Sequence, residues 1–298
     1  MNSENTYEYA NQRYKTPRDA AAYWVAEIDN ATDREEDWRA DAKDAAEEYD
    51  SETSTNAADR NAFNILYSNV ETLVPALYSS TPAPDCRPRN GRQDELARRA
   101  GTLLEECIAF QVDNQDFDEK ITDAIYSHQI AGRGVLRVRY NPIMSEVAYM
   151  DGQTGEEVAF EETNIECVSW DKFLVGTATN WETVPWVAFK HAMTRDELLE
   201  LVWDEEDPEA SEALADAVPL DEDTGIDKDG EAKGVFSRAC VWEIWDRDSR
   251  TVIYLAPYYR ESLLAVIDDP LQLRNFFPCP RPLQAKRQGM DKMTPLCP

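Results

Sequence analysis

The densest group of chemically capable side chains lies in the acidic stretch that ends near residue 231. Four aspartates fall between Asp221 and Asp229, around Gly225 and Gly230, which invites comparison with a calcium-binding loop. If Gly230 takes the sixth position of such a loop, Gly225 falls at the first, where an acid is required. Phe236 then falls at the twelfth position, where a bidentate glutamate is required. The template fails at both ends, so the sequence favours a solvated acidic loop over a metal site.

Two glycine pairs raise the question of phosphate binding. Gly225 and Gly230 have the spacing of a phosphate loop, but Glu231 and Ala232 follow instead of Lys and Ser or Thr. Gly132-Arg-Gly134 precedes a predicted strand instead of a helix, so the helix N-terminus that holds an anion is absent and a turn is favoured. The sequence therefore predicts no nucleotide motor.

Cysteine and histidine offer no recognisable catalytic or metal-binding pattern. No CxxC and no GxSxG occurs, and the two histidines, His128 and His191, lie far apart. We predict that His128 is a packed helix residue, and that Cys107 and Cys167 belong to the core. We expect no enzyme activity, no cofactor and no bound metal. The six cysteines are scattered, as is typical of reduced intracellular proteins: Cys86, Cys107, Cys167, Cys240, Cys279 and Cys297.

Charge and composition limit the partners. The 298 residues are 42% hydrophobic, which is enough for a folded core, and carry a formal net charge of −29. Such a chain is not expected to wrap nucleic acid tightly, because duplex affinity comes largely from Lys and Arg that neutralise phosphates. An acidic wall can still let DNA slide past it. No apolar run is long enough to span a membrane, and the first residues do not resemble a signal peptide, so no membrane partner is expected.

Helices are predicted in the first half of the chain. Thr16 and Pro17 indicate a helix start, and the helix should run to about Asp50. Its apolar face is thin, so we expect a peripheral helix. A linker follows, and a second helix begins near Asp59, with Pro75 kinking it or starting a new segment. Two further amphipathic helices are predicted over residues 96–108 and 117–128.

Strands are predicted next. Leu136 to Tyr140 alternate in polarity, and a hairpin turn is expected near Asp151-Gly152. Thr194 to Glu197 form a capping box for a short helix. Further short strands are expected at 146–149, 157–160, 165–170 and 186–189, a hairpin at 240–245 and 251–255, and an extended segment at 276–282. The fold class is α+β: N-terminal helices, then a small antiparallel β region, a short helix and a β-hairpin.

Four segments follow from this order. They are a peripheral helical segment (1–58), an α+β core (59–203), an acidic mobile insertion (204–234), and a hairpin with a proline-rich segment (235–298). Clustered arginines stand out from the acidic background, and salt bridges to the excess of carboxylates are their favoured role. Arg137 and Arg139 share one strand face, which makes them candidates for an interface.

Several stretches together resemble the portal proteins of short-tailed bacteriophages. They are residues 64–82, 130–140, 170–174, 181–188, 193–198, 241–246 and 276–283, in that order and at compatible spacing. The resemblance implies a subunit of a closed ring, usually a dodecamer, at one vertex of the capsid of the virion, assembled in the host cytoplasm. It also implies binding partners: the terminase large subunit, a tail adaptor or head-completion protein, and the major capsid and scaffolding proteins. Double-stranded DNA would pass through the ring without sequence-specific binding.

By the same resemblance, residues 59–194 correspond to the outward-facing wing, and the later segments approach the stem and clip. The candidate interface residues are Arg137, Arg139, Phe276, Phe277, Pro278, Pro280 and Pro282. Portal proteins continue with long helices after the proline-rich motif, so we expect this chain to be truncated or partial.

Two other functions compete with the portal. The net charge of −29 also suits an acidic adaptor that binds a basic partner, and such binding would weaken steeply with salt. A metal-dependent hydrolase that uses Asp221–Asp229 ranks last, because no ligand template fits that region.

Overall fold

A computed structural model describes residues 14–50, 64–88, 94–148, 154–220 and 237–284. It confirms the α+β class, with helices and antiparallel sheets mixed along the chain. The described residues form two compact units. Unit 1 comprises residues 14–40, 171–220 and 237–277, and unit 2 comprises residues 41–50, 64–88, 94–148, 154–170 and 278–284. These units cut across the four segments predicted from the sequence, because chain segments far apart in sequence pack together.

Unit 1 is built on a five-stranded antiparallel sheet. Its strands, in spatial order, are β3 (Phe173–Val175), β4 (Trp186–Met193), β5 (Ala239–Asp246), β6 (Thr251–Leu255) and β7 (Ala265–Asp268). The hairpin β5–β6 confirms the predicted one, with Trp245 opposite Val252. Short 3-10 turns at Trp170–Lys172 and Trp181–Thr183 precede β3 and β4. Successive side chains of the central strands point to opposite faces of the sheet, and most of them are buried on both faces. Each face must therefore pack against another part of the chain.

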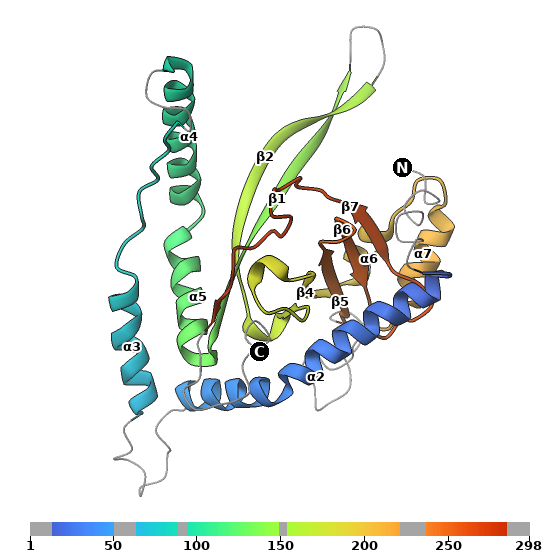
Figure 1. Cartoon of the computed structure of the whole chain (residues 1–298). Coiled ribbons are helices and arrows are strands. Elements are labelled where there is room, and N and C mark those ends of the chain that lie inside the picture. Colours follow the sequence, from blue (N-terminus) through green and yellow to red (C-terminus); the bar gives the residue numbers. More distant parts are fainter. Residues whose placement is uncertain (1–13, 51–63, 89–93, 149–153, 221–236, 285–298) are drawn as a thin grey trace, which may run out of the picture. The chain divides into compact units, whose positions relative to one another are not determined.

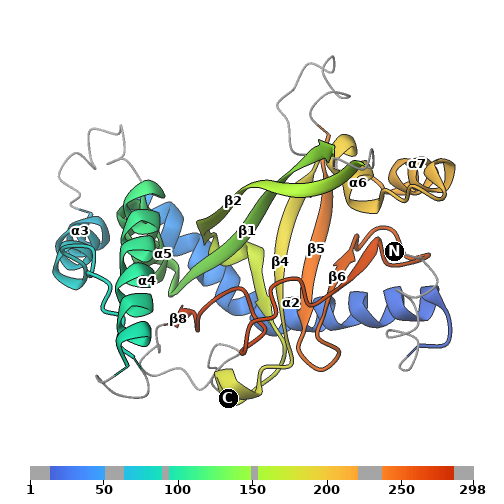
Figure 2. The ribbon, with the colours of Figure 1, turned by 90° about the horizontal axis from the view of Figure 1, so that it is seen from above.

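The first part of α2 (Pro17–Asp50) covers one face of this sheet, as Figures 1 and 2 show. Thr16 caps it, since its hydroxyl accepts a hydrogen bond from the Asp19 amide at 3.1 Å. Trp24 is almost fully buried and meets Trp186 edge-to-face, with ring centroids 6.2 Å apart. This part of α2 keeps most of its side chains exposed and packs its thin apolar face, with Trp24, Val25 and Ile28, on the sheet. The stripe combines Trp24, Val25 and Ile28 with the small residues Ala20, Ala21 and Ala31.

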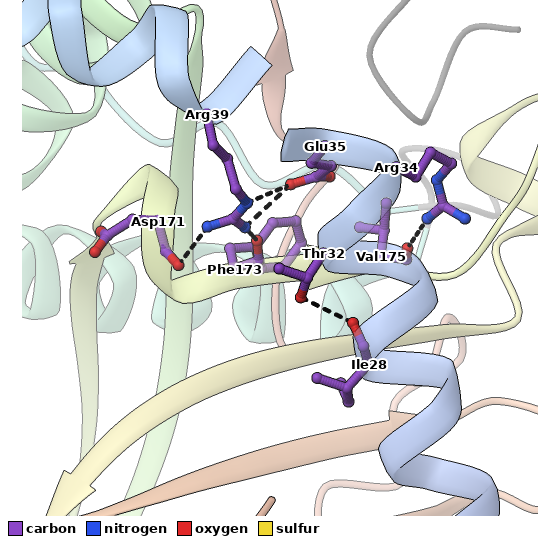
Figure 3. Close-up of polar contacts among 8 residues, drawn as sticks. All are labelled: Ile28, Thr32, Arg34, Glu35, Arg39, Asp171, Phe173 and Val175. Carbon is purple, nitrogen blue, oxygen red and sulfur yellow. Dashed lines mark hydrogen bonds and ion pairs between the residues drawn. The ribbon is translucent and has the colours of Figure 1, made fainter. Parts of the chain in front are cut away.

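Two arginines of α2 bind the carbonyl groups around β3 (Figure 3). Arg34 donates through Nη2 to the carbonyl of Val175 at 2.8 Å. Arg39 donates to the carbonyls of Asp171 and Phe173 at 2.8 and 2.9 Å. Backbone carbonyls at the edge of a sheet have no strand neighbour on that side, so these guanidinium groups satisfy them.

Two short helices also belong to unit 1. The capping box predicted at Thr194 is confirmed at the start of α6 (Arg195–Val202), where the Thr194 amide donates to the Glu197 carboxylate at 2.7 Å. Helix α7 (Pro208–Ala217) follows. The prediction of an exposed insertion from residue 204 is wrong for this part, because Ala215 and Val218 are buried in a cluster with Leu198. Residues 221–236 lie outside the described residues, and so does the aspartate group considered as a calcium loop.

Unit 2 contains a long hairpin of β1 (Arg133–Ala148) and β2 (Thr154–Val168), visible in Figure 1 as a twisted ribbon. The two strands pair antiparallel from Val135–Val168 to Ala148–Thr154, with a bulge at Ile143 and Met144. The predicted short strands are therefore wrong in length: they merge into two continuous ones. The turn at 151–152 lies outside the described residues. The short strand β8 (Leu283–Gln284) pairs with the start of β1.

The helices of unit 2 are α3 (Ile65–Leu77), α4 (Glu95–Asn114) and α5 (Phe117–Ala131). Val70 and Val74 of α3 pack against Ile125 of α5 in a small apolar cluster. Helix α3 continues through Pro75 to Leu77, so this proline starts no new segment, although it cannot donate a hydrogen bond to the carbonyl of Glu71. The residues between 51 and 63, which include the predicted linker, are outside the described part of the chain.

Two glycines set the junction between α5 and β1. Gly132 ends the helix with φ 86, and its amide donates to the carbonyl of His128 at 3.1 Å. Gly134 lies so close to α5 that a Cβ atom there would be 2.1 Å from the carbonyl oxygen of Ala124. The predicted turn at this motif is thus a helix cap followed by a close contact between helix and strand.

Candidate functional site

The proline-rich segment begins in unit 1 with two phenylalanines, Phe276 and Phe277, that pack against tryptophan rings; we call this cluster the aromatic lock. Phe276 has a positive φ of 67, and both it and Phe277 are buried. The Phe276 ring lies 5.3 Å from the Trp245 ring, and the Phe277 ring lies 5.5 Å from the Trp181 ring. The guanidinium of Arg247 stacks over Phe277 at 4.2 Å, and burial lowers the pKa of this arginine. Both phenylalanines therefore stabilise unit 1.

The rest of this segment belongs to unit 2. The amide of Val138 donates to the carbonyl of Pro278 at 2.8 Å, so the segment runs alongside β1 before it pairs as β8. Pro278, Cys279 and Pro282 are buried, whereas Pro280 is exposed. Burial raises the pKa of the Cys279 thiol to about 12, although nearby Arg137 opposes the shift.

Arg137 and Arg139 share one strand face, as predicted, and both reach the carboxylate of Glu166 on β2, at 3.4 and 3.7 Å. Only 5% of the Arg137 side chain is exposed, against 45% for Arg139. Arg87 and Arg99 likewise pair with nearby carboxylates, which confirms the salt-bridge interpretation for these arginines.

Most of the predicted interface residues are therefore internal to the folded chain. Only Arg139 and Pro280 are exposed, and their role in an interface stays a prediction. The other five candidates are buried, so they are not available as an exposed surface, because aromatic and proline rings that resemble a docking motif in sequence can also pack inside a fold. The buried members are Arg137, Phe276, Phe277, Pro278 and Pro282.

A polar group that the sequence analysis did not identify lies within unit 1. The carboxylate of Glu243 is buried and lies 2.9 Å from Nε2 of His191, and it accepts a hydrogen bond from the Trp245 indole at 2.7 Å. Alternation along β5 puts Val241, Glu243 and Trp245 on the same face, so the sequence alone predicts that Glu243 shares a face with apolar residues. It does not predict the partner on β4. The Glu243 carboxylate thus joins His191 of β4 and Trp245 of β5 in one buried polar network.

A shallow polar hollow of about 300 Å³ lies in unit 2 where the segment after α3 meets the start of α5. The Asp118 carboxylate accepts hydrogen bonds from the hydroxyls of Thr81 and Tyr78, and these bonds lower its pKa. The hydroxyls hold Asp118 in place, and the hollow has no basic side chain among its lining residues, which makes it a poor site for phosphate or nucleic acid.

The most distinctive surface of unit 2 is apolar. Helix α4 has no buried residue, and Leu96, Leu103 and Phe110 are 78%, 62% and 64% exposed. Cys107, predicted to be in the core, is exposed on the same helix, so that prediction is wrong. Further exposed apolar side chains occur on α3 and on the hairpin: Ile65, Leu73, Leu77, Val138, Ile143, Met144, Val158 and Phe160. Exposed apolar side chains that gather along one helix, as they do on α4, are typical of an interaction site.

Within the described residues, no group of three or more His, Cys, Asp or Glu side chains could hold a metal ion. None of the helices in the same residues is long and apolar enough to cross a membrane.

Comparison of the chain with models of protein families and with curated proteins found no match.

Proposed function

We propose that this chain is a portal-like subunit, a structural component of a ring through which phage DNA is packaged and later ejected. The observation that carries the proposal is the exposed, uncharged apolar surface on α3 and α4 in a chain with a net charge of −29. A surface of that kind is suited to contact with protein, because phosphate binding requires Lys and Arg.

The resemblance in sequence supports the proposal further. Its stretches coincide with two whole elements, α3 and β5, and with three connections between elements. These connections are the glycine junction between α5 and β1, the start of α6, and the aromatic lock at Phe276. A ring subunit needs such junctions to keep one shape in every copy. The proposal assigns no catalytic step, cofactor or metal to this chain. The partners would be further copies, the terminase large subunit, a tail adaptor, and the capsid and scaffolding proteins, with DNA passing an acidic wall.

Light scattering coupled to size-exclusion chromatography tests this proposal. A ring predicts a particle many times heavier than the 34.0 kDa chain, at micromolar concentration and over a wide range of salt. A monomer at every concentration and salt would contradict it.

The alternative is an acidic adaptor for a basic partner, and the observation that favours it is the net charge. Complexes held by charge weaken steeply as salt rises. Capture of basic proteins that is lost between low and moderate salt, from a chain that stays monomeric, would favour the adaptor over the ring.

A further inference from the structure

Helix α4 carries an apolar stripe that is exposed in the described part of the chain. Leu96, Leu103 and Phe110 are spaced by seven residues, and Ala100 and Cys107 fall between them. At 3.6 residues per turn these five positions and Leu104 lie within a band about 120° wide. All six are exposed. A seven-residue repeat of large apolar side chains is the pattern that packs against another helix.

No charged side chain falls within this band. The charged residues of α4 lie on its flanks and far side, where Arg99 pairs with Glu95 at 2.6 Å. Gly101 faces the chain segment at Cys86, whose carbonyl oxygen would be 3.0 Å from an added Cβ atom. Among the described residues, the side of α4 at Gly101 is therefore already occupied, whereas the side chains of the stripe are exposed. A helix with an exposed stripe gains stability only when another surface covers it.

Helix α3 presents a second face of the same kind. Its only charged residue is Glu71, which points inward and accepts a hydrogen bond from the Tyr49 hydroxyl at 2.6 Å. The outward face is exposed and uncharged: Ile65, Asn69, Thr72, Leu73, Ala76 and Leu77. Unit 2 therefore offers two different charge-free helical faces.

Charge identifies the occupant. A basic partner would require carboxylates at the contact, and neither face has them. A second copy of this chain is repelled by the net charge of −29 over most of its surface, but not where two uncharged faces meet. A two-fold dimer would need one self-complementary face, whereas a ring needs two different faces. Unit 2 has two.

We infer that the α4 stripe of one copy packs against the outward face of α3 in the neighbouring copy. This inference rests on the proposed ring and names the surfaces that close it. Because the surrounding surfaces repel each other, salt should strengthen the association, in contrast to the binding of a basic partner.

Charge substitution tests the stripe. In the purified full chain, L103E combined with F110E should abolish assemblies seen by light scattering and electron microscopy, while circular dichroism keeps the native helix content and the melting temperature equals that of dissociated native subunits. T102E is the matched control, since Thr102 is exposed on the same helix outside the stripe, and its assemblies should persist. Assemblies that survive the double substitution would overturn the inference.

Disulfide trapping tests the pairing. Cysteines introduced singly as I65C, L73C or A76C, with Cys297 replaced by Ser, should oxidise with Cys107 of the next copy. At least one of them should produce a ladder of covalent multimers, since a disulfide requires Cα atoms about 5.5 Å apart. The ladder should vanish when C107S is added.

The outcomes separate the inference from the proposed function. Rings without any ladder, or covalent dimers through Cys107 alone, would overturn the α4–α3 pairing and leave the ring standing. A native chain that forms no assembly at any salt would overturn both.

Discussion

The guanidinium of Arg39 lies 3.0 Å from the carboxylate of Glu35, one turn away on α2, and the Glu35 side chain is fully buried. The same guanidinium reaches the carbonyls that precede and begin β3. A single arginine thus neutralises a buried carboxylate and joins α2 to the sheet of unit 1 (Figure 3). Through this contact, α2 is attached to the sheet by a polar interaction in addition to its apolar face.

Loss of Arg39 should destabilise the protein strongly. R39A leaves Glu35 buried without this cation, so we expect the free energy of unfolding to fall by about 3 kcal/mol in urea denaturation. K43A is the matched control on the same helix, because Lys43 and Glu47 are both exposed and lie 3.8 Å apart. It should change stability by less than about 0.5 kcal/mol. Equal effects of the two substitutions would show that Arg39 is not an anchor.

Gly134 should tolerate no side chain. The Cβ atom of G134A would lie 2.1 Å from a backbone oxygen of α5, so helix and strand must separate, and we expect a loss of about 3 kcal/mol. At Gly101 the nearest atom is 3.0 Å away, and alanine favours the helix, so G101A should be close to neutral. Thermal unfolding of both variants measures the contrast. A G134A protein as stable as the native chain would contradict the close contact.

His128 should make stability depend on pH. Burial lowers its pKa in the folded protein, so the unfolded chain binds the proton more readily. This contribution is complete above the unfolded pKa, about 6.5, and is lost as pH falls through the lower folded pKa. The difference in unfolding free energy between the native chain and H128Q should therefore shrink from pH 7.5 to pH 5. A difference that is constant with pH would exclude this role.

Thiol labelling should separate two cysteines. Cys107 is exposed, whereas Cys279 is buried and burial raises the pKa of its thiol, so Cys279 stays in the unreactive thiol form at pH 9. In dissociated subunits, iodoacetamide should modify Cys107 quickly and Cys279 only after denaturation, as mass spectrometry of peptides would show. Equal labelling rates would mean that the segment at Cys279 is not packed as described.

Local signals were predictable from sequence. The capping box at Thr194 and the hairpin around Asp246 depend on residues within a few positions of each other, and both are confirmed. The role of α2 depends on Trp24 meeting Trp186, a partner far along the chain, and no local pattern reveals it. Short strands such as β8 depend on a neighbouring strand and carry too few residues to show a period.

The candidate interface shows the same limit. Phe276 and its neighbours have the composition of a docking motif, but burial depends on Trp181 and Trp245, which contact them only in the fold. The opposite error concerns α4. Its apolar spacing predicts a helix with Cys107 buried in the core, whereas Cys107 is exposed in the structure. Periodicity identifies an apolar face but not the molecule that covers it.

Negative-stain electron microscopy of the purified protein, in the length that its gene encodes, tests the central claim most directly. The portal proposal predicts closed rings with a central hole that persist as salt is raised. Small compact particles without a hole, at every concentration and salt, would contradict the proposal.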